Sequence, residues 1–198
     1  KRMGLEHVVI TAVDRDDLPD GGATGFVEAI LALRELDPAP AIEVLTPDFR
    51  GDLTAVDRII AVGPEVYNHN VETVPRLYGE VRPGADYQRS CRVLHNVRQM
   101  DPAMVTKSGL MVGLGETRQA VLQVMDDMRS ADVDFLTIGQ YLQPTAHHHP
   151  VMRYWSPDEF ADLERLGYEL GFRHVASGPL VRSSYHAEKQ LQKEKDFI

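Results

Sequence analysis

The stretch VTKSGLMVGLGETRQAVLQVMDDMRSADVDFLTIGQYL, residues 105–142, contains the pattern that decides the fold of this chain. It opens and closes with short runs of apolar and β-branched residues, 105–112 and 135–142, which are typical of buried strands. Residues 117–130 between them place apolar side chains at helical spacing. Two strands joined by a helix of this length predict a β-α-β unit with parallel strands and a right-handed crossover.

The same alternation extends over the rest of the chain. Such units are too few here for a closed eight-stranded barrel, which takes about 250 residues. The prediction is an α/β fold, a partial parallel (β/α)6 barrel that lacks its first strand, with an open doubly wound sheet as the alternative. We expect residues 1–198 to form one domain, with a helical extension from about residue 184. Further strands are predicted at 7–13, 41–45, 65–70 and 174–177, and further helices at 25–36, 52–62, 86–99, 157–170 and 184–194.

The composition argues against nucleic-acid and membrane roles. The chain has 21 Lys and Arg residues against 30 Asp and Glu residues, and its formal net charge of −9 is unfavourable for binding phosphate backbones or anionic lipid. No apolar run approaches the roughly 20 residues that span a bilayer. Cys91 is the single cysteine, so the chain can form neither an intrachain disulfide nor a cysteine cage for a metal, and we expect a cytoplasmic location.

The first residues suggest that a preceding segment is missing. Residues 1–7 include two basic residues, but the apolar segment after them is interrupted at Asp14, which is typical of a strand and not of a secretory signal. Position 1 is Lys1 and not an initiator methionine. A barrel without its first strand is expected to leave an exposed, aggregation-prone sheet edge.

Polar residues follow every predicted strand, and the carboxyl ends of parallel strands are where sites form. Asn68, Asn70 and Glu72 share one face if the third strand alternates regularly. Their amides and carboxylate suit a ribose or an amino-acid moiety, because the set can both donate and accept hydrogen bonds. A polar turn that caps the next helix explains the same residues equally well.

Two features of the fourth strand allow alternative interpretations. Lys107 is a candidate Schiff-base nucleophile if it is desolvated, but an ion pair with a neighbouring Asp or Glu is the favoured interpretation. The segment 113–116, Gly-Leu-Gly-Glu, resembles a phosphate or cofactor loop, although two glycines are weak evidence.

Three other polar segments favour structural roles. The carboxylates of residues 14–20 could ligate Mg²⁺ or Ca²⁺, but helix capping and a pairing with Arg15 are favoured. The run 147–149 contains three consecutive histidines, which cannot all face one ion in an extended loop. Ser183 or Ser184 can serve as the N-cap of the last helix.

A series of motifs resembles the lipoyl synthase family, whose members are radical S-adenosylmethionine enzymes. The motifs occur in order over nearly the whole chain and are specific as a series, although each is weak alone. They are VDRDDLPDGGA (13–23), TPDFRG (46–51), NHNVETV (68–74), YQRS (87–90), TKSGLMVGLGE (106–116), QPT (143–145), Arg153-Tyr154 with Pro157, and SGPLVRSSYHA (177–187).

The resemblance implies a radical S-adenosylmethionine type of barrel and the insertion of two sulfur atoms at C6 and C8 of a protein-bound octanoyl-lysine. It implies S-adenosylmethionine and two [4Fe–4S] clusters as cofactors, Ser184 as a ligand of the auxiliary cluster, and Arg182 close to that cluster. It also implies octanoylated lipoyl carrier domains as partners, namely the E2 subunits of 2-oxoacid dehydrogenases and the glycine cleavage H protein, with a reductant such as ferredoxin or flavodoxin. The residues expected to line the S-adenosylmethionine pocket are Asn68, Asn70, Glu72, Lys107 and Ser108.

The chain departs from the family in its cysteines. Both cysteine triads of the family lie upstream of the first matching motif, and Cys91, in a predicted helix, cannot replace them. We therefore expect this polypeptide alone to bind neither cluster stably and to lack lipoyl synthase activity. Two alternatives are a non-catalytic remnant that binds the acylated carrier domain and a cluster-free Schiff-base enzyme that uses Lys107.

Overall fold

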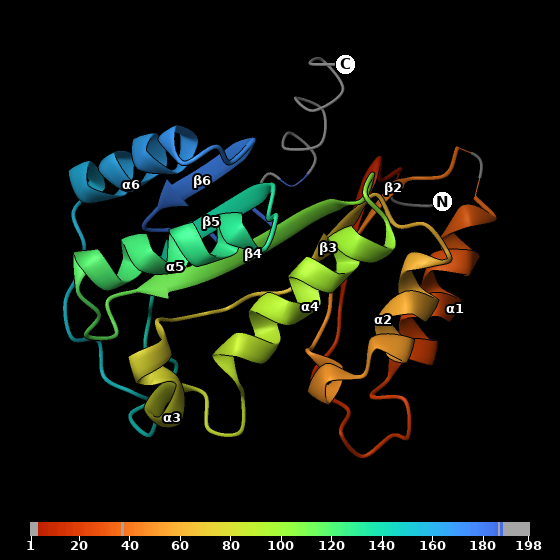
Figure 1. Cartoon of the computed structure of the whole chain (residues 1–198), viewed down its shortest axis with the longest axis horizontal. Helices are drawn as coiled ribbons and strands as arrows, with labels where there is room; N and C mark the ends of the chain where they lie inside the picture. Colours follow the sequence, from red (N-terminus) through yellow and green to blue (C-terminus); the bar gives the residue numbers. More distant parts are fainter. Residues whose placement is uncertain (1–3, 37, 186, 188–198) are drawn as a thin grey trace.

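A computed structural model of the chain describes residues 4–36, 38–185 and 187. Six parallel strands form one sheet in the order of the sequence, β1 to β6, and helices cover its outer face (Figure 1). The elements are β1 His7–Thr11, α1 Ala23–Arg34, β2 Ala41–Leu45, η1 Phe49–Gly51, α2 Leu53–Ile60, β3 Val66–Asn68, η2 Pro75–Leu77, α3 Tyr78–Val81, α4 Tyr87–Met100, β4 Val105–Val112, α5 Arg118–Ser130, β5 Phe135–Gln140, α6 Pro157–Glu169 and β6 His174–Gly178.

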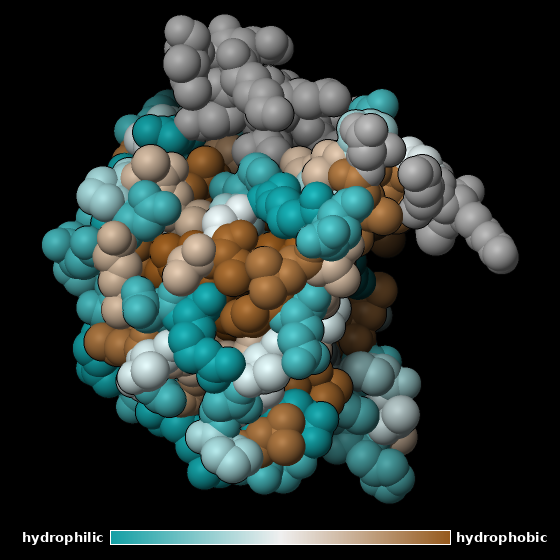
Figure 2. Space-filling model, turned by 90° about the vertical axis from the view of Figure 1, so that its right-hand side faces the viewer, coloured by the Kyte–Doolittle hydropathy of each residue, from teal (hydrophilic) through white to brown (hydrophobic). Residues whose placement is uncertain are grey.

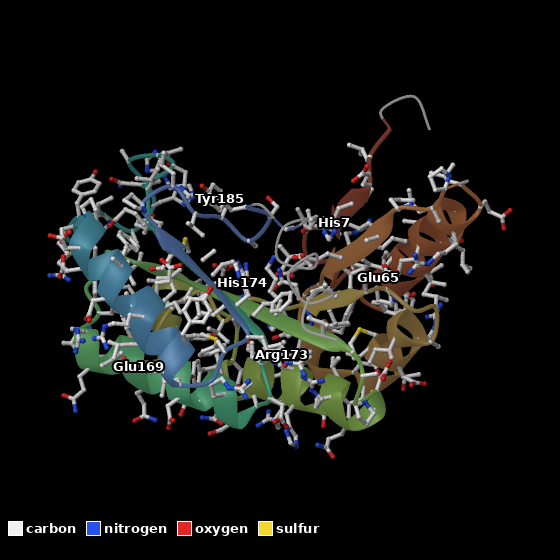
Figure 3. The ribbon with its side chains drawn as sticks, turned by 90° about the horizontal axis from the view of Figure 1, so that it is seen from above. His7, Glu65, Glu169, Arg173, His174 and Tyr185 are labelled. Atoms are coloured by element: carbon white, nitrogen blue, oxygen red, sulfur yellow. The ribbon has the colours of Figure 1, made fainter. Side chains whose placement is uncertain are left out.

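The partial parallel barrel predicted from the sequence is confirmed. Among the described residues β1 and β6 are the two edges of the sheet, and each pairs with one strand only. The view from above shows the strands along an arc with the helices outside it, and the labelled His7 and His174 mark the two edge strands (Figure 3). The helix predicted at 184–194 lies mostly outside the described residues.

Several boundaries differ from the prediction. The first and fifth strands end two residues earlier than expected, at Thr11 and Gln140. The third strand, expected at 65–70, spans only Val66–Asn68. The short helices η1, η2 and α3 occur in segments where the sequence predicted only loops.

The helix starts follow the local capping chemistry. The Asp86 side chain accepts a hydrogen bond from the Arg89 amide at the start of α4, where the sequence predicted a cap. Ser156 and Glu159 form a reciprocal capping box at the start of α6, with Pro157 at its first position. These caps satisfy amide groups that have no partner within the helix.

Most of the apolar core lies between the strands and the outer helices. One cluster packs α4, α5 and α6 against β4, β5 and β6, and a second packs α1 and α2 against β2 and β3. Figure 2, which faces the side of α1 and α2, shows a patch of hydrophobic surface on this side. No helix in the described ranges is both long and apolar enough for a membrane span.

The inner face of the sheet is built in layers, because every second residue of a strand points inward. Val66, Val105 and Phe135 form the lowest layer, a small apolar cluster. Two residues further along the same strands come Asn68 and Lys107, which are fully buried and polar. Two residues beyond Lys107 there is no side chain, because the position is glycine. Toward the carboxyl ends of the strands, the inner face of the sheet therefore has first apolar side chains, then polar and charged ones, and then a glycine that leaves space.

Candidate functional site

A bulge at the carboxyl end of β3 shapes the upper part of the inner face. Asn68 pairs with Lys107, whereas Glu72 forms an isolated bridge with Leu110, so the β3 side contains one residue more than the β4 side. Glu72 has a φ of 65°, a left-handed conformation that costs a residue with a side chain about 1–2 kcal/mol. Its backbone is held by two bonds, from Glu72 N to Gly109 O at 3.0 Å and from Met111 N to Glu72 O at 2.8 Å.

The bulge brings Asn70 and Glu72 together, although not by the regular strand alternation that the sequence predicted. Asn70 Nδ2 donates to Glu72 Oε1 at 3.2 Å. Burial raises the pKa of Glu72, and the opposing effects of the Arg82 charge and the Asn70 amide are smaller. Asn68 does not join this pair, because its amide donates to Glu43 in the layer below. Of the three residues expected on one face, two form the upper site.

The segment that follows β6 crosses the open side of the sheet and reaches this pair. We call residues 179–185 the strap. Asn70 Nδ2 donates to Ser183 Oγ at 3.2 Å, across 113 residues of sequence. Figure 3 shows the strap, on which Tyr185 is labelled, turning back from β6 over the sheet. The strap therefore places Ser183 beside Asn70 and Glu72, a contact that no local sequence signal indicated.

Two glycines on the inner face make room for this arrangement. A Cβ at Gly109 would lie 2.4 Å from Thr137 Oγ1 and 3.0 Å from Asn70 Oδ1. A Cβ at Gly139 would lie 2.3 Å from the carbonyl oxygen of Val181, in the strap. A larger residue at position 109 would displace Thr137 and crowd Asn70, and a larger residue at position 139 would displace the strap. Asn70 Oδ1 is buried and has no hydrogen-bond partner among the described residues.

Lys107 and Glu43 form a buried ion pair below this level. Lys107 Nζ lies 3.0 Å from Glu43 Oε1, and the two side chains are 0% and 1% exposed. Burial lowers the pKa of Lys107, against the opposite effect of Glu43. Burial alone would raise the pKa of Glu43, but the facing groups of His7, Lys107 and Asn68 lower it below its ordinary value.

The ion pair confirms the favoured interpretation of Lys107. Its amine is occupied by the Glu43 carboxylate, which argues against a Schiff-base nucleophile. Asn68 Nδ2 also donates to Glu43 Oε1, at 2.9 Å. Sequence reasoning missed Glu43, although a signal was present. A glutamate at the centre of the apolar strand Ala41–Leu45 is the acidic partner that a buried lysine requires.

Ser108 lies on the opposite face of β4 from Lys107, because neighbouring residues of a strand alternate. Its hydroxyl donates to the carbonyl oxygen of His69 at 2.8 Å. The ring of His69 is buried between strand and helix, with Nδ1 2.9 Å from Thr46 O and Nε2 3.0 Å from Ser90 Oγ. Since a carbonyl oxygen only accepts, Nδ1 carries the proton and Nε2 accepts from Ser90. Ser108 and His69 therefore fix the end of β3 from the outer face of the sheet, opposite the site.

The buried His69 predicts a pH dependence of stability. Burial lowers the pKa of His69 below its ordinary value of 6.5. As the pH falls below that value the unfolded chain takes up a proton that the folded chain refuses, so stability decreases by up to about 1.4 kcal/mol per pH unit until the folded pKa is reached. In urea unfolding at several pH values, His69→Gln should show a flatter decline than the unsubstituted chain. His147→Gln, at an exposed position, serves as the control, and an unchanged slope in His69→Gln would contradict the prediction.

The Gly113–Glu116 segment is not an open phosphate loop. The buried carboxylate of Glu116 accepts from the backbone amides of Gly113 at 2.6 Å and Leu114 at 2.8 Å, which a phosphate would otherwise use. It also accepts from the indole nitrogen of Trp155 at 2.9 Å. The similarity to a phosphate loop thus has a structural explanation, since the loop binds an anion supplied by its own chain.

The remaining polar segments of the sequence analysis have structural partners. The Asp20 carboxylate accepts from the amides of Gly22 and Thr24 at the start of α1, as the capping interpretation predicted. Asp16 and Asp17 pair with arginines. His149 places Nε2 2.8 Å from the carbonyl oxygen of Leu114 and Nδ1 3.1 Å from Glu80.

The described residues do not provide a metal-cluster site. Within residues 4–36, 38–185 and 187, no group of three or more His, Cys, Asp or Glu side chains is placed to hold a metal ion. Cys91 lies in α4, away from the inner face, and burial together with its surroundings raises the pKa of its thiol to about 11. A thiolate is therefore disfavoured there. Ser184 is exposed in the strap and offers one oxygen.

An arc of parallel strands with polar groups at their carboxyl ends defines a β/α-barrel enzyme class. The model of the Radical SAM superfamily matches residues 1–128, and the chain belongs to this superfamily. Within it the resemblance to lipoyl synthases is confirmed. The chain is 59% identical over 193 residues to the lipoyl synthase of Stenotrophomonas maltophilia (strain R551-3) and 58% identical to that of Xylella fastidiosa (strain 9a5c), with 96% of this chain matched in each case.

The chain spans about half the length of these curated relatives, 57% of the first and 52% of the second. Solved structures show the same fold. Methylornithine synthase (PylB) matches with a TM-score of 0.60 and 14% identity, over 88% of this chain and 57% of its own. SuiB of Streptococcus suis matches with a TM-score of 0.52 and 12% identity, over 88% of this chain and 50% of its own.

Proposed function

We propose that this chain forms the barrel body of a lipoyl synthase, which inserts two sulfur atoms at C6 and C8 of a protein-bound octanoyl-lysine. The proposal depends on one observation, a direct contact between two motifs of the family. Ser183, in the motif 177–187, accepts a hydrogen bond from Asn70, in the motif 68–74 at the end of β3. The high identity to lipoyl synthases over nearly the whole chain supports the same reaction.

The upper inner face fits S-adenosylmethionine, which in this superfamily supplies a carbon radical that removes hydrogen from an unreactive C–H bond. The buried acceptor Asn70 Oδ1 has no partner among the described residues, and a bound hydroxyl or ammonium group would satisfy it. The adjacent Glu72 carboxyl can accept from the same groups. We assign Asn70 and Glu72 to direct contact with the cofactor.

The other residues of the predicted pocket have supporting roles in this proposal. Lys107 and Asn68 hold the Glu43 carboxylate and form a rigid polar layer below the site. Ser108 fixes β3 against β4 from the outer face. These three residues orient the end of β3. The Lys107 amine, the Asn68 amide nitrogen and the Ser108 hydroxyl each already have a protein partner, whereas Asn68 Oδ1 has none among the described residues.

We propose two [4Fe–4S] clusters, as the resemblance implies, but their cysteine ligands are not among the residues of this chain, whose one cysteine is Cys91. Ser184 is the proposed protein oxygen ligand of the auxiliary cluster, with Arg182 close to it. The proposed partners are octanoylated carrier domains of 2-oxoacid dehydrogenase E2 subunits and the glycine cleavage H protein, with ferredoxin or flavodoxin as the reductant.

The proposal predicts that activity depends on joining this chain to cysteine-bearing sequence. The chain alone, reconstituted anaerobically with iron and sulfide, should retain far less iron than two clusters require. A chimera in which this chain replaces the matching 193 residues of the Stenotrophomonas maltophilia relative should bind the clusters and convert an octanoylated carrier to the lipoylated form, measured by mass spectrometry.

The chimera also tests Ser184. Ser184→Ala in the chimera should abolish sulfur insertion, whereas Ser130→Ala, at an exposed position at the end of α5, should leave it unchanged. A chimera that binds both clusters but produces no lipoyl group would refute the proposed function. Near-stoichiometric clusters in the chain alone would refute the assignment of the ligands.

A further inference from the structure

We infer that Ser183 is a positioning residue, which orients the Asn70 carboxamide so that its oxygen faces the ligand. Ser183 sits in the strap, and its Oγ is 3.2 Å from Asn70 Nδ2. The ligand in this inference is the adenosyl cofactor of the proposed function, and to that extent the inference rests on it.

The hydrogen bonds determine which way the Asn70 amide points. Its nitrogen has two hydrogens, and it lies 3.2 Å from Glu72 Oε1 and 3.2 Å from Ser183 Oγ. The amide nitrogen donates one hydrogen to Glu72 Oε1 and the second to Ser183 Oγ. Both amide hydrogens are committed, and only Oδ1 is left for a ligand.

The amide oxygen of Asn70, which has no partner among the described residues, is buried beside Gly109. A Cβ at Gly109 would lie 3.0 Å from this oxygen. If Ser183 lost its oxygen, the amide would keep one acceptor and could rotate about its last side-chain bond. The orientation of the acceptor therefore depends on a residue that itself does not need to touch the ligand.

Packing and hydrogen bonds hold the strap against the sheet, so that Ser183 can orient the Asn70 amide. Val181 is 7% exposed, and its carbonyl oxygen occupies the space that a side chain on Gly139 would take. Arg182 Nη1 donates to that carbonyl at 2.7 Å and to Gln140 O at 3.5 Å. The absence of a side chain at position 139 thus allows Ser183 to reach the end of β3, although the two positions are on different elements.

The positioning role is tested first without any ligand, by NMR of the ¹⁵N-labelled 198-residue chain. The side-chain amide signal of Asn70 is assigned by its loss in Asn70→Asp. Ser183→Ala should shift the two Asn70 amide protons, Ser183→Thr should restore them, and Ser130→Ala should leave them unchanged. Gly139→Ala, which displaces the Val181 carbonyl, should reproduce the shift of Ser183→Ala. An unchanged Asn70 signal in Ser183→Ala overturns the inference.

Binding of S-adenosylhomocysteine, measured by calorimetry, then tests the consequence for the ligand. Ser183→Ala should weaken binding about three- to tenfold, the effect of one neutral hydrogen bond, and Ser183→Thr should restore it. Equal affinity in Ser183→Ala and the unsubstituted chain overturns the inference. If the unsubstituted chain does not bind the probe while the NMR shifts occur, the positioning contact stands and the assignment of the cofactor site fails.

Discussion

Lys107→Met is expected to lower the free energy of unfolding by about 3–5 kcal/mol, because it leaves the Glu43 carboxylate buried without its cation. The two side chains are 0% and 1% exposed, so water cannot replace the missing partner. The loss should appear as a lower urea midpoint with an unchanged slope. Arg165→Met, which breaks an exposed pair with Glu169, is the matched control and should have a much smaller effect.

The double variant Lys107→Met with Glu43→Gln should recover much of the loss, since a neutral amide needs no counter-charge. The single variant should also depend on pH. Without Lys107 the pKa of Glu43 is expected to rise above its unfolded value, so the deficit is small at low pH and grows as the pH rises through the folded pKa. A double variant as unstable as Lys107→Met would show that the pairing is not the cause.

Glu116→Ala is expected to have the second largest effect, about 3 kcal/mol, because three donors lose one charged acceptor. These donors are the backbone amides of Gly113 and Leu114 and the indole of Trp155. Trp155 is the single tryptophan and is 4% exposed, so its fluorescence reports directly on the hydrogen bonds around Glu116.

The emission of Trp155 should move to longer wavelength in Glu116→Ala under native conditions, as water reaches the indole. Glu169→Ala, which removes an exposed carboxylate paired with Arg165 in α6, should leave the emission unchanged and cost less stability. Unaltered emission together with unaltered stability in Glu116→Ala would contradict the role assigned to this carboxylate.

The periodic pattern predicted the fold well because it depends on neighbouring residues. The stretch 105–142 forms the expected strand, helix and strand, and the four other predicted strands also formed in the expected order. The capping roles of Asp86 and Pro157 likewise depend on hydrogen bonds and backbone angles within one helical turn. The pairing of Lys107 with an acidic residue followed from the cost of burying a lone charge.

The candidate site was only partly predictable. Asn70 and Glu72 were recognised as polar groups at a strand end, and they meet in the structure. Their geometry depends on a bulge that adds one residue opposite β4, and the local sequence gives no signal of that register change. The assignment of Gly113–Glu116 as a possible anion loop could not anticipate that its anion is Glu116 itself.

The sequence by itself therefore determined the alternation of strands and helices, the starts of α4 and α6, the kinds of polar group at the strand ends and the family. Only the tertiary structure decided which groups meet. Glu43 and Lys107 are 64 residues apart, and Asn70 and Ser183 are 113 residues apart. The first pairing is set by the register between strands, and the second by the path of the strap over the two inner glycines. Local backbone preferences do not encode either pairing, because each pairing forms only when segments far apart in the sequence come together in the folded chain.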